Sequence, residues 1–154
     1  MELELPTDFK ELFKSLNSNK VEYLLIGGYA VIIHGYVRNT SDLDLVVSRD
    51  AENAARCVNA LTEFGFAGPD LKDSLFASPE KNLLRMGVAP VKIEILNYLE
   101  GVDFVGAYAR RISKDVEEIQ IDVISLEDLI KNKTEVGRLQ DLLDVEKLRE
   151  RNDL

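Results

Sequence analysis

The feature that most constrains this chain is a glycine pair, followed 14 residues later by two aspartates that flank a leucine. Gly27-Gly28 separates two apolar runs, 21–26 and 29–34, which predicts a tight turn from a buried strand into a helix. Because glycine has no side chain, the backbone of such a turn can approach a phosphate closely, and the start of the helix presents free N–H groups. Glycine pairs are common in plain turns, so the meaning of this one depends on the aspartates that follow.

The segment Asp42-Leu-Asp-Leu alternates acidic with apolar residues, which predicts a strand over 42–47. Side chains alternate between the two faces of a sheet, so Asp42 and Asp44 are expected on one face. Two neighbouring carboxylates repel each other unless a cation lies between them. Mg²⁺ prefers such oxygen ligands together with substrate phosphates, so this strand indicates a magnesium site. The alternative is a solvated strand face of alternating polarity.

Glu94 is the candidate for a third ligand. It lies between two isoleucines in the apolar segment 91–96, which predicts a largely buried strand. A buried carboxylate without a partner is costly. If this strand lies beside the Asp42 strand, three carboxylates converge and can hold two Mg²⁺ ions, an arrangement used for in-line attack on phosphorus. The alternative is an exposed acid on an edge strand that pairs with Lys92.

The rest of the chain predicts a mixed α/β (α+β) domain with about five strands flanked by helices. Apolar periodicity and turn residues place strands over 21–26, 42–47, 83–88, 91–96 and 119–124. The same signals place helices over 7–20, 29–34, 50–64 and 102–110, one helix from Ser125, and a last one over 138–151. Strands 83–88 and 91–96 are expected to pair antiparallel through a turn at Ala89-Pro90, and 68–80 is expected to be a loop or lid.

Several residues have structural interpretations. Thr7 is expected to cap the first helix and Asp128 to complete a capping box with Ser125. His34 and Cys57 are interpreted as packing residues. The last helix has an apolar stripe that is expected to face the core, formed by Leu139, Leu142, Leu143, Val145 and Leu148.

Two acids of that last helix are left outside the candidate site. Asp141 and Asp144 are interpreted as capping residues or as partners of Arg138 and Lys147.

Length and charge narrow the function. With 154 residues, the chain is expected to form one domain, 1–154, with the helices of 125–151 packed on it. The net charge of −9 argues against long nucleic acid as a partner, since its affinity depends on Lys and Arg. No run is long enough to span a bilayer, residues 1–6 are not typical of a secretory signal, and Cys57 is the only cysteine. We therefore expect no membrane association and a cytoplasmic location.

A family resemblance brings these observations together. The chain resembles the nucleotidyltransferase superfamily, whose members include DNA polymerase beta, aminoglycoside nucleotidyltransferases and small antitoxin-type nucleotidyltransferases. Within this superfamily it resembles the bacterial branch. The resemblance spans about residues 20–148. It rests on Gly27-Gly-Tyr-Ala, His34, Gly35, Arg38, Thr40, Asp42-Leu-Asp, and the tail segments Ser125–Lys133 and Arg138–Asp144.

This resemblance implies transfer of a nucleoside monophosphate from a nucleoside triphosphate to a hydroxyl acceptor, with release of pyrophosphate. It implies that Asp42 and Asp44 hold the metal ions and that Glu94 is the third ligand or the base for the acceptor hydroxyl. Most relatives have Asp at the position of Glu94, so this chain departs from the pattern there.

The nucleotide-binding candidates are Gly27, Gly28, Arg38, Thr40, Ser41 and Lys133. Arg38 and Lys133 are candidates to contact the triphosphate, and Thr40 and Ser41 are candidates to donate their hydroxyls to phosphate, roles that spacing alone does not show. A structural ion pair is the alternative for Arg38, and an exposed position beside Glu135 is the alternative for Lys133.

Two functions therefore stay open. The first is a metal-dependent nucleotidyltransferase with an unknown small-molecule or protein acceptor. The second is a non-catalytic nucleotide- or partner-binding module of the same fold, such as an antitoxin with a toxin-type protein partner. The sequence also leaves a homodimer open. A dinucleotide-binding fold is disfavoured, since the third glycine of its fingerprint is missing and Asp42-Leu-Asp is left without a role.

Overall fold

The apolar runs form a six-stranded mixed sheet in a computed structural model that describes residues 3–87 and 92–154. The strand order is β3-β4-β2-β1-β6-β5. Strand β1 pairs antiparallel with β2 and parallel with β6, and β2 pairs parallel with β4, while β3 and β5 add antiparallel edges. The strands are β1 (Tyr23–Ile26), β2 (Asp42–Val47), β3 (Leu83–Met86), β4 (Lys92–Leu96), β5 (Ile112–Val116) and β6 (Ile119–Val123).

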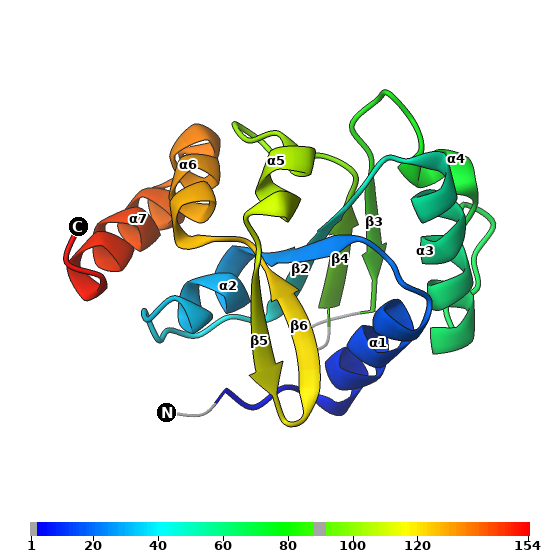
Figure 1. Cartoon of the computed structure of the whole chain (residues 1–154), viewed down its shortest axis with the longest axis horizontal. Helices are drawn as coiled ribbons and strands as arrows, with labels where there is room; N and C mark the ends of the chain where they lie inside the picture. The colour runs from blue at the N-terminus through cyan, green and yellow to red at the C-terminus, as the bar shows by residue number, and fades with distance from the viewer. Residues whose placement is uncertain (1–2, 88–91) are drawn as a thin grey trace.

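Helices cover both faces of this sheet (Figure 1). On one face, α1 and α3 pack against each other and against the sheet, and α1 contributes Phe9, Leu12, Phe13 and Leu16 to the buried core. On the other face lie α2 and the C-terminal pair α6 and α7. The helices are α1 (Thr7–Ser18), α2 (Gly27–Ile33), α3 (Ala51–Phe64), α4 (Asp73–Phe76), α5 (Phe104–Ala109), α6 (Leu126–Val136) and α7 (Leu139–Arg151).

The predicted mixed α/β architecture is confirmed, with one strand more than expected. Strand β5 was missed because Ile112-Ser-Lys-Asp-Val116 has four exposed residues and no apolar alternation. It forms as the partner of β6 in a hairpin. Helix α4 lies in the segment predicted as a loop, 68–80. The predicted turn at Ala89-Pro90 falls outside the described residues, whereas the antiparallel pairing of β3 with β4 is confirmed.

Two capping predictions need correction. Pro6, not Thr7, occupies the N-cap of α1 and makes no side-chain cap bond. Ser125 does cap α6 by accepting a hydrogen bond from the Asp128 amide. The Asp128 carboxylate does not complete a capping box, because both of its oxygens accept from Arg110, at 2.9 and 3.1 Å.

The apolar stripe predicted for the last helix packs against the core only at Val145 and Leu148. Leu148 is buried, but Leu139, Leu142 and Leu143 are exposed by 89%, 48% and 40%. The inward face of α7 instead carries Asp141, Asp144 and Leu148, which recur at helical spacing. The helix turns this polar face inward because its neighbours present basic side chains.

A buried amide positions the β3 edge. The Asn97 side chain donates to the carbonyls of Phe76, Ser78 and Glu80, and its oxygen accepts from the Asn82 amide. Asn97 directly follows β4, so these bonds fix the loop that leads into β3 against the end of β4. This loop sets where the side chains of β3 stand relative to those of β4.

Candidate active site

The two aspartates of β2 lie on one face of the sheet, as the alternation predicts. Leu43 and Leu45 are fully buried on the other face. Strand β4 lies directly beside β2, and the parallel register places Asp44 opposite Glu94 and Asp42 opposite Lys92. The sheet therefore brings three carboxylates and one lysine onto the same surface.

The carboxylate of Glu94 is held by two cations. It accepts from Arg85 Nε at 3.0 Å and lies 3.1 Å from Lys92 Nζ. Lys92 also lies 3.8 Å from a carboxylate oxygen of Asp42. Burial opposes the charge of Glu94, but Lys92 and Arg85 outweigh it and lower its pKa. Glu94 thus pairs with Lys92, although β4 is an inner strand and the Glu94 side chain is only 18% exposed.

Asp44 is in the opposite situation. Burial, followed by the nearby negative charges of Glu94 and Asp42, raises the pKa of Asp44 to about 7, and Lys133 offsets only part of this. A carboxylate that is buried beside two others favours its neutral form unless a cation reaches it. The site therefore holds one carboxylate whose charge is not compensated by a direct ion pair from any residue within 3–87 and 92–154.

The donor chemistry of this surface suits a hard divalent cation. Carboxylate oxygens on one face are the ligands Mg²⁺ prefers, and a cation at Asp44 would relieve the repulsion that raises its pKa. The side chains of Asp42 and Glu94 contact protein cations, however, and no three His, Cys, Asp or Glu residues within 3–87 and 92–154 are arranged to hold one ion. The match to Mg²⁺ is therefore one of ligand type and charge.

The glycine pair lies against this surface. Gly27 has a φ of +70°, and a Cβ added there would lie 2.4 Å from Asp44 Oδ2. A Cβ added to Gly28 would lie 2.4 Å from Thr40 Oγ1 and 2.8 Å from Thr40 Cβ. Both contacts are too close for a side chain, so the glycines allow the start of α2 to approach β2 and the segment before it. Sequence spacing alone does not reveal this contact between the glycines and Asp44.

The hydroxyl residues before β2 turn toward Asp42. Thr40 Oγ1 donates to the Asp42 carbonyl at 3.4 Å, and Ser41 Oγ donates to the Asp42 carboxylate at 3.1 Å. Thr40 and Ser41 both line the same cleft as the aspartates. Both residues thus lie beside the acidic strand, and their role toward phosphate stays a prediction.

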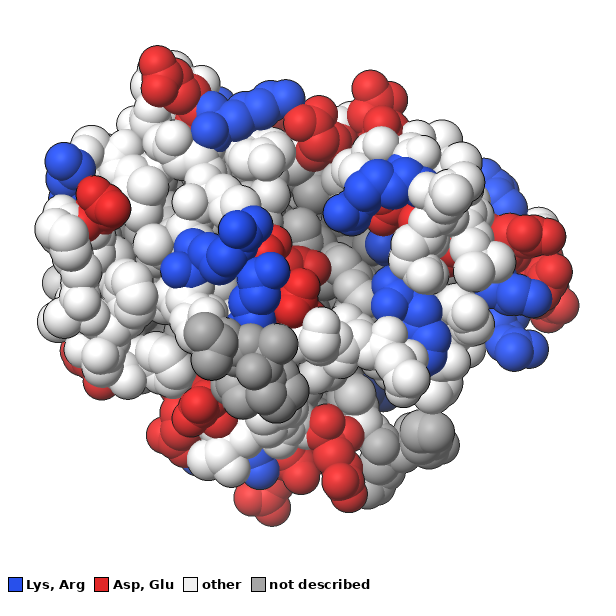
Figure 2. Space-filling model, turned by 180° about the vertical axis from the view of Figure 1, so that it is seen from behind, with Lys and Arg blue, Asp and Glu red and all other residues white. Residues whose placement is uncertain are grey.

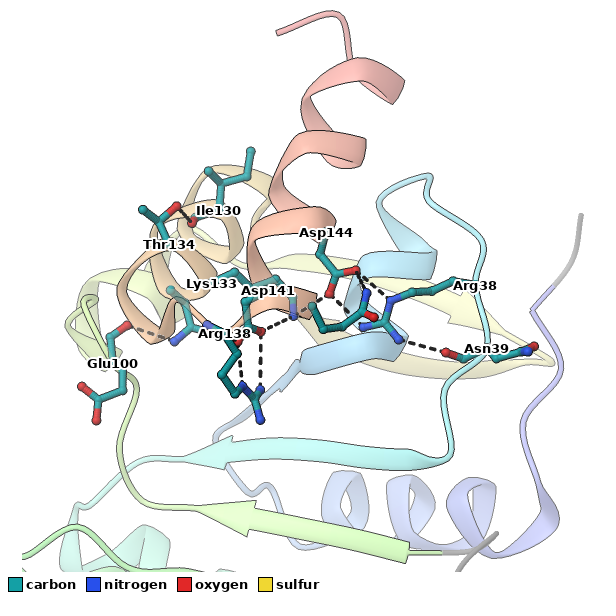
Figure 3. A network of polar contacts seen from close by, with 11 residues as sticks. Arg38, Asn39, Glu100, Ile130, Lys133, Thr134, Arg138, Asp141 and Asp144 are labelled. Carbon is teal, nitrogen blue, oxygen red and sulfur yellow. Dashed lines mark hydrogen bonds and ion pairs between the residues drawn. The ribbon is translucent and has the colours of Figure 1, made fainter.

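Arg38 and Lys133 belong to an ion-pair network between the α6–α7 pair and the segment before β2 (Figure 3). Lys133 Nζ lies 3.0 Å from Asp141 Oδ1 and 2.9 Å from Asp144 Oδ2. Arg38 binds Asp144 with two hydrogen bonds of 2.8 Å, and Arg138 binds Asp141 at 2.7 Å. Burial opposes the charge of both aspartates, but these donors lower the pKa of each below its usual value.

This network changes two interpretations from the sequence. Lys133 is not exposed beside Glu135, because its side chain is only 6% exposed. Asp144 pairs with Arg38 and Lys133 and not with Lys147, which pairs with Glu150. Asp141 does pair with Arg138, as expected. Arg38 and Lys133 nevertheless line the cleft together with Asp141, so a structural ion pair and a position at the ligand site coexist.

These groups surround one open cleft with a volume of about 1230 Å³. All nine candidate site residues, Gly27, Gly28, Arg38, Thr40, Ser41, Asp42, Asp44, Glu94 and Lys133, line it. Figure 2 views the molecule from the side opposite to Figure 1 and shows a hollow in the middle, with acidic side chains on its wall and basic side chains beside them. Sequence reasoning did not place Arg85 and Arg138 in the site, although both line the cleft.

His34 and Cys57 lie elsewhere. The His34 ring bonds the Ile124 carbonyl at 2.7 Å, and burial lowers its pKa. Cys57 is buried in α3. Both are packing residues, as the sequence indicates.

Among the described residues, no helix is long and apolar enough to cross a membrane.

Solved structures share this fold at low sequence identity. A proposed nucleotidyltransferase from Thermotoga maritima, TM1012, is 20% identical with a TM-score of 0.62, over 93% of this chain and 91% of its own. The lincosamide antibiotic adenylyltransferase LnuA, solved with lincomycin, is 16% identical with a TM-score of 0.61, over 94% and 96%. The antibiotic-resistance factor ANT(2'')-Ia is 13% identical with a TM-score of 0.53, over 94% and 82%. These likenesses confirm the predicted nucleotidyltransferase fold.

The family is identified from the sequence. No curated protein matches the chain significantly. The family model for aminoglycoside-2''-adenylyltransferase matches residues 8–148, which is most of the chain. This match confirms the predicted superfamily and, with it, the prediction of a nucleotidyltransferase enzyme. The chain therefore belongs to the aminoglycoside-2''-adenylyltransferase family.

Proposed function

We propose that this protein is a Mg²⁺-dependent nucleotidyltransferase that moves a nucleoside monophosphate from a nucleoside triphosphate to a hydroxyl acceptor. The observation that carries the proposal is the placement of Asp42, Asp44 and Glu94 on one sheet surface, against the glycine pair and inside an open cleft. The family name favours ATP as the donor. A cytoplasmic location, where nucleoside triphosphates are made and used, is part of the same proposal.

Asp42 and Asp44 are the proposed metal ligands, with Glu94 at the acceptor side. Mg²⁺ bound there supplies charge neutralisation for the triphosphate and for the departing pyrophosphate. The raised pKa of Asp44 supports this assignment, because a cation next to that carboxylate would favour its ionised form.

The remaining candidates orient the donor. Gly27 and Gly28 keep side chains out of the region between α2 and β2, and Thr40 and Ser41 contribute hydroxyl donors. Lys133 has three N–H donors, and the two aspartates of α7 account for two of them. Its third N–H is proposed to bind the triphosphate, while Arg38 adds positive charge at the cleft wall.

In the proposed reaction, the acceptor hydroxyl oxygen forms a bond to the α-phosphorus. The bond from this phosphorus to its bridging oxygen breaks, and pyrophosphate leaves with the bonding electrons. Glu94 accepts the proton of the hydroxyl. Its lowered pKa means that the carboxylate is ionised, and so able to accept a proton, at neutral pH.

The ion pairs of Glu94 favour a second candidate, a nucleotide-binding protein without turnover. Arg85 and Lys92 already occupy the carboxylate that would act as ligand or base. In this case, nucleotide binding would depend on Asp42 and Asp44, and no acceptor would be modified.

Calorimetric titration of Mg-ATP and the other nucleoside triphosphates tests the shared site. The wild type is compared with the double variant Asp42→Asn/Asp44→Asn and with Asp70→Asn, a control that removes an exposed carboxylate outside the cleft. We expect metal-dependent binding by the wild type and the control, and none by the double variant. A folded wild type that binds no nucleotide at millimolar concentration would overturn the proposal.

Turnover separates the two candidates. Pyrophosphate release with a mixture of hydroxyl compounds is measured for the wild type and for Glu94→Gln. The transferase is supported if the wild type releases pyrophosphate and the Glu94→Gln variant does not, while the variant keeps its nucleotide affinity. Binding without release in both proteins supports the binding module.

A further inference from the structure

The cleft has two sides with different chemistry. The glycine pair lies where β1 passes into α2, with Thr40 beside it, and Arg85 lies on β3 at the far edge of the sheet. Strand β3 is three positions from β1 in the strand order, which corresponds to roughly 14 Å at the usual strand spacing. If the donor phosphates lie at the glycine pair, the β3–β4 side is left for the acceptor.

The carboxylates of the cleft are already paired with protein cations. Asp42 and Glu94 contact Lys92, Glu94 also binds Arg85, Glu100 binds Lys81 at 2.7 Å, and Asp141 binds Lys133 and Arg138. Asp44 alone among the described cleft carboxylates has no such ion pair, and it is assigned to the metal. The lining contains five acidic and five basic side chains, Asp42, Asp44, Glu94, Glu100, Asp141, Arg38, Arg85, Lys92, Lys133 and Arg138.

The cleft is therefore balanced in charge although the whole chain carries −9. A polycationic ligand needs free carboxylates, and this wall offers none beyond the metal position.

Arg85 is a charged group on this side with unused hydrogen-bonding capacity. Its Nε donates to Glu94, and it makes no other hydrogen bond to the described residues. Its side chain is 59% exposed and lines the cleft, so the two terminal nitrogens are available to a ligand bound there. A guanidinium fork binds carboxylate or phosphate oxygens in pairs, and Glu94 holds this one in place.

An apolar patch adjoins Arg85. Leu83 and Leu96 are register partners, two pairs along from Arg85 and Glu94 and therefore on the same face of the sheet. Tyr98 and Leu99 continue this surface, and Val136 adds to the cleft lining from α6. An acceptor bound here would place a charged group at Arg85 and an apolar body on these side chains.

We propose that the acceptor is a small hydroxyl compound that carries an anionic group, a carboxylate or a phosphate, next to an apolar body, and that Arg85 binds this group. The inference rests on the proposed function and narrows it to a substrate class. It sets this chain apart from an enzyme for polycationic acceptors.

A series of probes with one scaffold tests the charge preference. The probes are 3-phenyllactate, 2-hydroxy-3-phenylpropyl phosphate, 3-phenyllactamide and 1-amino-3-phenylpropan-2-ol, which share a hydroxyl and a phenyl group and differ in charge. Their affinities are measured by NMR titration of the protein saturated with Mg²⁺ and a non-hydrolysable ATP analogue. The proteins are the wild type, Arg85→Gln, and Arg149→Gln as a control that removes an exposed arginine outside the cleft.

We expect the wild type and Arg149→Gln to bind at least one anionic probe roughly tenfold more tightly than the amine. Arg85→Gln should lose this preference and keep its affinity for the ATP analogue. The ratio of carboxylate to phosphate affinity identifies which anion is preferred. Equal or tighter binding of the amine, no binding of either anion, or an unchanged preference in Arg85→Gln would overturn the inference.

The two proposals fail separately. A folded wild type that does not bind the ATP analogue would contradict the proposed function. Normal analogue binding with no anionic preference contradicts only the acceptor class.

Discussion

Asp44 and Glu94 stand opposite each other on β2 and β4, yet only Glu94 has cations bonded to its carboxylate. Burial and the negative neighbours raise the pKa of Asp44 to about 7, whereas Lys92 and Arg85 lower that of Glu94. The two pKa values differ because Arg85 on β3 and Lys92 on β4 both contact Glu94 and not Asp44. This difference makes Asp44 the position where an added cation changes the energy of the site most.

Asp44→Asn is predicted to stabilise the metal-free protein at neutral and alkaline pH. The folded pKa of about 7 lies above the unfolded value of 3.8, so the wild type is destabilised progressively as pH rises from 3.8 to 7 and fully above that range. This difference between the folded and unfolded pKa values corresponds to a destabilisation of the folded state by at most roughly 4 kcal/mol. Denaturant unfolding with EDTA at pH 5 and pH 8 should therefore show a larger gain at pH 8.

Asp70→Asn is the control for this experiment, because Asp70 is exposed and outside the cleft. Its free energy of unfolding should change by less than about 0.5 kcal/mol at either pH. An Asp44→Asn variant that is less stable than the wild type at pH 8 would show that Asp44 is compensated in the fold.

Asp144→Asn is predicted to have the opposite pH dependence. The pKa of Asp144 is lowered, because Arg38, Lys133 and Gln140 donate to it and outweigh its burial. Its stabilisation is therefore complete above the unfolded pKa of 3.8 and is lost as pH falls through the lower folded value. Unfolding curves of wild type and variant should differ clearly at pH 6 and approach each other at pH 3. A difference that is constant with pH would assign the effect to packing.

The acidic strand pair was predictable from the sequence because both of its signals are local. Period-two alternation places Asp42 and Asp44 on one face. The apolar residues on both sides of Glu94 predicted a strand, and this strand, β4, does lie beside β2. The chemistry of the carboxylates also depends on the cross-strand Arg85, which no spacing within the chain reveals.

Strand β5 and the α7 network escaped prediction for physical reasons. The β5–β6 hairpin turns at Glu117 and Glu118, which have φ values of +50° and +70°. Such turns favour Asn and Gly, so a Glu-Glu pair gives no signal. Local spacing favoured Lys147 as the partner of Asp144. Its actual ion-pair partners are Lys133 and Arg38, and Arg38 is 106 positions away in the chain.

Gly28→Ala is predicted to destabilise the protein and weaken nucleotide binding. The added methyl would lie 2.4 Å from Thr40 Oγ1 and 2.8 Å from Thr40 Cβ, so the segment before β2 must shift. Overpacking of this kind typically costs about 1–3 kcal/mol. Gly68→Ala is the control, because its added methyl would meet only Phe66 ring atoms at 3.5 Å or more. Thermal unfolding and Mg-ATP calorimetry on both variants check the prediction, and equal stability of the two would contradict it.

Lys133→Met is predicted to be among the most destabilising single changes in the C-terminal helices. The ammonium is nearly buried between Asp141 and Asp144, and its loss leaves two buried carboxylates with only arginine and amide donors. Removing one partner of a buried ion pair typically costs about 3–5 kcal/mol. Lys131→Met is the matched control on the same helix, since Lys131 is 59% exposed and pairs only with Glu127. Urea unfolding should separate the two variants by at least about 2 kcal/mol. Because α6 and α7 form one wall of the cleft, the Lys133→Met variant should also lose nucleotide affinity under conditions where it remains folded, whereas Lys131→Met should keep it.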